Sequence, residues 1–135
     1  MVDALSRARE LVVTSGCVID LHPTAAPAIV LAGDVVGGEV DTGSAKVRHQ
    51  NATDAVAAAV RLGLFAVDDT TEFDFSIYAD TLDALQQHIH DDWREGNIGN
   101  LAYDRTQALL QAAPGIRPRV RERIVINRLV AARPD

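Results

Sequence analysis

Cys17-Val18-Ile19-Asp20-Leu21-His22, followed by Pro23, is the stretch that decides the predicted fold. Ser15-Gly16 turns the chain into this mostly apolar run, which ends in polar side chains. Inner strands of parallel α/β sheets have this composition, and such sheets bind ligands at the C-terminal ends of their strands. The stretch therefore predicts a strand over residues 17–22, with Asp20 and His22 as substrate-binding candidates at its end.

Helical and strand patterns alternate along the rest of the chain. Apolar spacing and capping residues predict four helices. Two of them cover residues 3–11 and 100–113, and a third covers 52–62 after an Asn51 cap. The fourth begins at an Asp80 cap and has Leu82, Leu85, Ile89 and Trp93 on one face. Residues 28–31 and 35–40 are expected to form a hairpin of two strands around Gly33-Asp34. Further strands are expected over 46–48, 71–78 and 120–130. Another strand is expected over 64–67 and is interrupted at Asp68-Asp69. This order predicts a single α/β domain over residues 1–135, with a mixed sheet, an added hairpin and covering helices.

Composition excludes several classes of protein. The chain of 135 residues is 47% hydrophobic and carries a formal net charge of -6, which repels nucleic-acid phosphates. No apolar run is long enough for a membrane span, and the charged N-terminus does not resemble a signal peptide. Cys17 is the single cysteine, which fits a reducing compartment and predicts a cytoplasmic protein with a buried, unreactive thiol.

Asp20 and His22 are the strongest candidates for chemistry. They lie two residues apart on one predicted strand, so both side chains point to the same face. They could bind a substrate or act as a base and its orienting acid, or they could simply satisfy loop amides around Pro23.

The other polar clusters favour simpler explanations. His88 and Asp92 share a helix face, but Zn²⁺ needs more ligands than these two, so no metal is expected. The alternating arginines at 117, 119, 121 and 123 could meet phosphate, but protection of an edge strand is the favoured explanation. His49 is expected in a loop, and Trp93 in the core.

Three segments carry a family resemblance. "LVVTSGCVIDLHP", "FAVDDTTEFDFSIYADTLDALQQHIHDDW" and "RPRVRERIVINRLVAA" resemble the fifth strand, the sixth strand with its helix, and the antiparallel seventh strand of class I S-adenosylmethionine-dependent methyltransferases. The resemblance implies a partial Rossmann-like sheet, the C-terminal half of that fold. Neither Gly37-Gly38 nor Gly96-Asn97-Ile98-Gly99 follows a buried strand and opens a helix, as a nucleotide-binding turn must. The cofactor site of that family is therefore not expected in this chain.

The expected function follows from that missing half. The chain is expected to be a methyltransferase-like domain without its own S-adenosylmethionine site, non-catalytic alone. A strand 17–22 without its usual neighbour leaves an apolar edge or sheet face uncovered, which predicts a homodimer or a cofactor-binding partner chain. The alternatives are a small-ligand-binding or interaction protein, and a small enzyme that uses Asp20 and His22.

Overall fold

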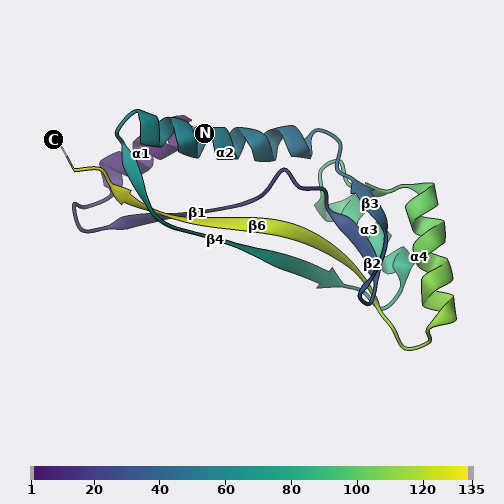
Figure 1. Cartoon of the computed structure of the whole chain (residues 1–135). Helices are drawn as coiled ribbons and strands as arrows, with labels where there is room; N and C mark the ends of the chain where they lie inside the picture. The colour runs from purple at the N-terminus through teal and green to yellow at the C-terminus, as the bar shows by residue number, and fades with distance from the viewer. Residues whose placement is uncertain (1, 134–135) are drawn as a thin grey trace. The chain divides into compact units, whose positions relative to one another are not determined.

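The computed structural model describes residues 2–133, and Figure 1 shows the chain. Its helices are α1 (Val2–Leu11), α2 (Ala45–Arg61), α3 (Leu82–Asp92) and α4 (Asn100–Ala112). Its strands are β1 (Cys17–Pro23), β2 (Ile29–Ala32), β3 (Val35–Asp41), β4 (Phe65–Tyr78), β5 (Asn97–Ile98) and β6 (Pro118–Ala131). β1 with β6, β2 with β3, β2 with β6 and β3 with β5 all pair antiparallel. The fold is α/β, as predicted, and its sheet is mostly antiparallel.

The described chain divides into two compact units. Within the described residues, the first comprises residues 2–25, 47–73 and 124–133, and the second comprises Ala26–Lys46 and Asp74–Arg123. Strands β4 and β6 contribute residues to both units. The expectation of a single domain stays a prediction.

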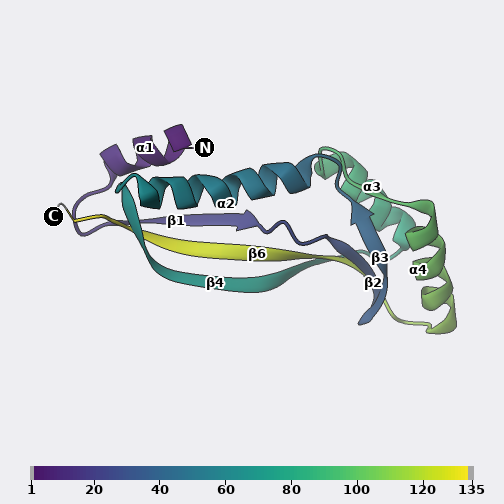
Figure 2. The same cartoon turned by 45° about the horizontal axis from the view of Figure 1, so that its top comes forward.

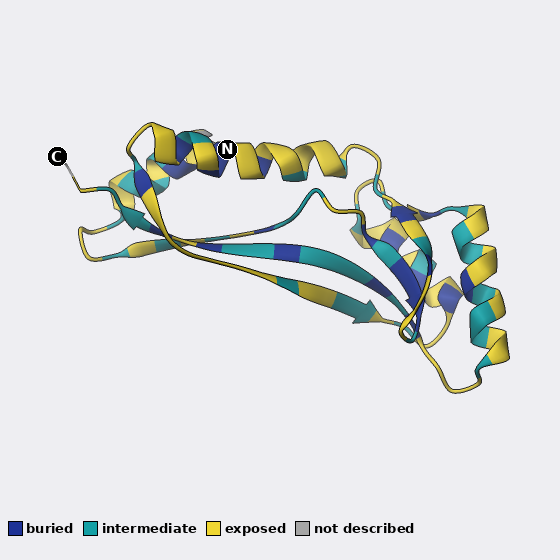
Figure 3. Ribbon diagram, in the orientation of Figure 1, coloured by how far each residue is buried: buried dark blue, intermediate teal, exposed yellow. Residues whose placement is uncertain are grey.

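In the first unit, α1 and α2 lie on the same side of the strands, as the two views in Figures 1 and 2 agree. The core between helices and strands is formed by Leu5, Ala55, Val56, Ala59, Phe65 and Leu129. Alanines dominate the buried side of α2, and most of its other positions are exposed (Figure 3). Small alanine side chains let this helix approach the strands closely while keeping a high helix propensity.

The opposite side of these strands, here called the apolar face, carries Ile19, Leu21, Phe73, Ile124 and Ile126. Ile19 and Leu21 are exposed, Phe73 and Ile126 are half-buried, and Ile124 is buried. Side chains alternate along a strand. Val18 packs into the core with the helices, so Ile19 and Leu21 point away from them. Leu21 pairs across the sheet with Ile126, and Pro23 with Ile124.

Phe73 belongs to the apolar face for the same reason. Thr70 of β4 reaches Asn127 on the helix side of the sheet, so Phe73, three residues later, points to the other side. No described helix of this unit lies over the apolar face (Figure 1), and Ile19 and Leu21 are 58% and 57% exposed.

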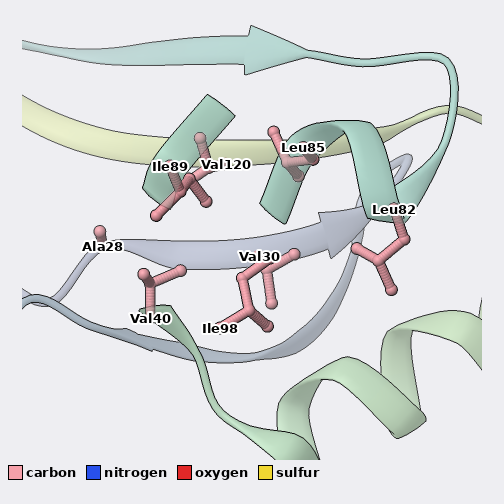
Figure 4. Packing of buried hydrophobic residues seen from close by; sticks show 8 residues of the cluster. All are labelled: Ala28, Val30, Val40, Leu82, Leu85, Ile89, Ile98 and Val120. Atoms are coloured by element: carbon pink, nitrogen blue, oxygen red, sulfur yellow. The ribbon is translucent and has the colours of Figure 1, made fainter. Parts of the chain in front are cut away.

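In the second unit, the predicted hairpin is confirmed as β2 and β3. The core shown in Figure 4 consists of Ala28, Val30, Val40, Leu82, Leu85, Ile89, Ile98 and Val120. The predicted α3 face is confirmed, with Trp93 partly buried beside it. Gly37 has a specific packing role, because a Cβ there would lie 1.8 Å from Oγ1 of Thr106 on α4.

The prediction of β1 as an inner strand of a parallel sheet is wrong. β1 lies at the end of the strand order, and the strand it pairs with, β6, runs antiparallel to it. Its apolar residues belong to two different faces, one packed under the helices and one exposed. A run that is apolar on both faces resembles a buried strand in sequence, which explains the error. Cys17, predicted to be buried, is exposed because it begins this edge strand on the side away from the helices.

Three local boundaries also differ from prediction. Residues 46–48 lie inside α2 and form no strand, so Asn51 is not the N-cap of this helix. Just before the helix, a carboxylate oxygen of Glu95 accepts a hydrogen bond from the backbone N–H of Ser44. Asp68-Asp69 does not interrupt β4, because at a sheet edge both carboxylates stay exposed to water. The α3 cap is Thr81, whose hydroxyl accepts from the N–H of Ala84, and not Asp80.

Candidate functional site

Asp20 and His22 lie together in the first unit, on the side of β1 that faces α2. Asp20 is paired with Asn127 of β6 in the sheet register, and Thr53 comes from the middle of α2. The structure therefore confirms that the two predicted residues share a face, and it adds neighbours from two other elements.

Hydrogen bonds join these side chains into a chain. His22 Nδ1 lies 3.0 Å from Asp20 Oδ2, and His22 Nε2 lies 3.1 Å from Thr53 Oγ1. Asn127 Nδ2 donates to Asp20 Oδ2 at 2.9 Å, and Thr70 Oγ1 donates to Asn127 Oδ1 at 2.8 Å. The chain thus crosses from β4 through β6 and β1 to α2.

The centre of this network is shielded from water. His22 and Asn127 are each 8% exposed, whereas Thr53 and Thr70 are exposed. Within residues 2–133, every buried side-chain nitrogen or oxygen has a hydrogen-bond partner. A buried polar network with all its members satisfied fixes the positions of the elements that contribute to it.

The Asp20 carboxylate determines which ring nitrogen of His22 carries hydrogen. An ionised carboxylate can only accept hydrogen bonds, so Nδ1 must be the protonated nitrogen that faces it. In neutral His22, Nε2 is then an acceptor, and the Thr53 hydroxyl donates to it. The Thr53 oxygen is therefore polarised by a base that a carboxylate holds in place.

The Thr53 hydroxyl has a second acceptor within reach. Its Oγ1 lies 3.3 Å from the backbone carbonyl oxygen of His49, one turn earlier in α2. The hydroxyl thus has two acceptors, Nε2 of His22 and this carbonyl oxygen.

His49 is the second histidine near this network, and it lies within α2 and not in the expected loop. Burial, followed by the positive charge of Arg48, lowers the pKa of His49. A hydrogen bond to the backbone of Thr24 acts in the opposite direction, and His22 adds a small further lowering. His49 is therefore favoured in its neutral form.

The other predicted clusters do not form a second centre. His88 Nδ1 lies 2.8 Å from Asp92 Oδ2 on α3, as their spacing predicts. Among the described residues, however, no group of three or more histidine, cysteine, aspartate or glutamate side chains is placed to hold a metal ion.

The arginine row has a structural role that differs from the predicted one. β6 pairs with β1, β2 and β4, so it is not an edge strand. Arg119 donates to the backbone oxygen of Gly33 and to Ser76, and it lies 3.2 Å from an Asp34 carboxylate oxygen. Arg123 binds Asp74 at 3.2 Å. These contacts link neighbouring strands and occupy donors that a phosphate would need.

Thr53, Thr70 and Asn127 were missed by reasoning from sequence. Thr53 lies in an alanine-rich helix, and Asn127 lies in a strand of apolar residues and arginines. An isolated polar residue on an otherwise buried strand face was the available signal for Asn127, because buried amides need partners. Thr53 gave no such signal, because it occupies an exposed helix position.

Comparison with known proteins found no matching family model, no matching curated sequence and no matching solved structure. Within residues 2–133, no helix is both long enough and apolar enough to cross a membrane.

Proposed function

We propose that this chain works as a self-associating module, in which the apolar face of one copy packs against the apolar face of a second copy. The observation that carries the proposal is the exposure of Ile19 and Leu21, at 58% and 57%, on a strand that also contributes to the core. Exposed apolar side chains gathered on one face commonly mark an interaction site.

The charge on this side of the sheet supports a second copy as the occupant. Arg128 pairs in register with Ile19, and its guanidinium binds the carboxylate of Asp68. These two opposite charges neutralise each other locally, so this pair adds no like-charge repulsion where two identical faces meet. A two-fold axis brings the same patch of each copy together, as self-complementary dimers require.

The size of the face sets the expected strength. β1 contains seven residues, so the face is about 23 Å long at about 3.3 Å per residue. Three strands about 4.8 Å apart give a width of about 14 Å and a projected area on the order of 300 Å². Stable dimers usually bury about 800 Å² per partner. We therefore expect a weak dimer that forms at concentrations on the order of micromolar or higher.

The methyltransferase resemblance remains a prediction. It would make the occupant a separate chain that binds S-adenosylmethionine. Such sheets bind their cofactor where parallel strands diverge, whereas the pairs β1–β6, β2–β3, β2–β6 and β3–β5 are all antiparallel. This difference favours a second copy over a cofactor-binding chain.

The proposal is tested by light scattering after size exclusion over a wide range of concentrations. Ile19→Asp places a carboxylate beside Arg128 in the sheet register, where an opposite charge is favourable for the folded monomer. This variant should stay monomeric when the wild-type mass rises toward that of a dimer.

Leu101→Asp is the matched control, because Leu101 is 73% exposed on α4 in the other unit. It should associate as the wild type does. A wild-type chain that stays monomeric at the highest concentration, or equal association of the wild type and Ile19→Asp, would contradict the proposal.

A further inference from the structure

We propose that Thr53 is a reactive hydroxyl that accepts acyl groups from activated esters, with His22 as its general base and Asp20 as the residue that orients the base. The inference does not depend on self-association. A nucleophile within hydrogen-bond reach of a base that a third group orients is the geometry typical of activated hydroxyls. The distances here are 3.1 Å for Thr53 to His22 and 3.0 Å for His22 to Asp20.

His22 and Thr53 differ in their exposure to water, as their proposed roles of base and nucleophile require. His22 is 8% exposed, so its ring is held in a fixed position away from bulk water. Thr53 is exposed, so a molecule from solution can reach this residue. Asn127 donates to the same carboxylate that holds His22, and Thr70 in turn holds the amide of Asn127. The orienting carboxylate is thus fixed from two sides.

The proposed step transfers one acyl group. The Thr53 Oγ1 forms a bond to the carbonyl carbon of the ester, and its proton moves to Nε2 of His22. The bond from the carbonyl carbon to the leaving oxygen breaks, and His22 returns the proton to the leaving group. The products are an ester of Thr53 and a free alcohol or phenol, and no oxidant or metal takes part.

The position of Thr53 limits this chemistry to activated esters. It lies in the middle of α2, where backbone N–H groups are used in the helix and cannot stabilise an oxyanion. Loss of one such donor typically costs about 10²- to 10³-fold in rate. A good leaving group compensates for this loss, so phenyl esters are the expected substrate class, and acylation should exceed any later hydrolysis.

The test uses the full chain with Cys17 replaced by serine, because the exposed thiol is a competing nucleophile. This protein is incubated with p-nitrophenyl acetate, and the acetylated residue is located by mass spectrometry of peptides. The expected product is an acetyl ester on Thr53. His22→Gln should lower its rate of formation by about 10²-fold or more, as expected for loss of a general base.

Two further variants complete the test. Thr53→Ser keeps the hydroxyl without the β-methyl group, so it should be acetylated at least as fast as Thr53. Thr71→Val removes an exposed threonine of β4 and should leave acetylation at Thr53 unchanged. Circular dichroism confirms that each variant is folded. Acetylation confined to Lys46 or the N-terminus, or equal rates at Thr53 with and without His22, would overturn the proposal.

Discussion

Replacing Asp20 by alanine should destabilise the first unit far more than the loss of one ordinary side chain. The substitution removes the acceptor for two shielded donors, Nδ1–H of His22 and Nδ2–H of Asn127, which lie 3.0 Å and 2.9 Å from it. A buried donor left without a partner costs about 1–3 kcal/mol. Water entering the space that Asp20 leaves recovers part of this cost, so we expect a net loss of about 2–4 kcal/mol.

Urea unfolding followed by circular dichroism measures this loss. With a denaturant slope of about 1–3 kcal/mol per molar urea, the midpoint should fall by on the order of 1–2 M. Asp68→Ala is the matched control, because it removes an aspartate from the same sheet whose partner, Arg128, is exposed. Exposed ion pairs contribute little, so this control should hardly move the midpoint. Equal shifts for the two variants would refute the view that the polar chain holds β1 to its neighbours.

The remaining predictions concern packing and pH. Gly37→Ala should lower the free energy of unfolding, measured by thermal denaturation, by about 1–3 kcal/mol or more, because its Cβ would overlap Thr106. Gly99→Ala should lower it far less, because no atom lies within 4 Å of a Cβ at that position. Burial raises the pKa of Glu122 above its ordinary value of 4.5. The free energy of unfolding should therefore fall as pH rises above 4.5, and Glu122→Gln should remove this trend from urea midpoints. The pKa of His49 is lowered from 6.5, so its contribution to stability is full above pH 6.5 and is lost as pH falls through the lowered pKa. His49→Gln should remove this loss of stability at low pH, measured as urea midpoints over the same range of pH.

Much of the fold was predictable because local patterns were strong. The periodic apolar residues of α3, the turn at Gly33-Asp34 and the apolar run of β1 each gave elements that the structure confirms. Strand direction was not predictable in this way, because it depends on which strand becomes the neighbour. The apolar run at β1 suggested burial on both faces, although one of those faces is exposed.

The candidate site was predictable only in part. Asp20 and His22 are two residues apart in sequence, so strand geometry alone places them on one face. Thr53 lies 31 residues from His22, and Asn127 lies 107 residues from Asp20. Contacts over such separations depend on how α2 and β6 pack in three dimensions, which no local pattern records.

A dilution series followed by methyl NMR most directly tests whether the apolar face binds a second copy. The methyl signals of Ile19, Leu21 and Ile126 should shift as the protein is concentrated, and those of Leu101 should stay fixed. Concentration-independent signals from the apolar face, or shifts confined to the second unit, would contradict this binding.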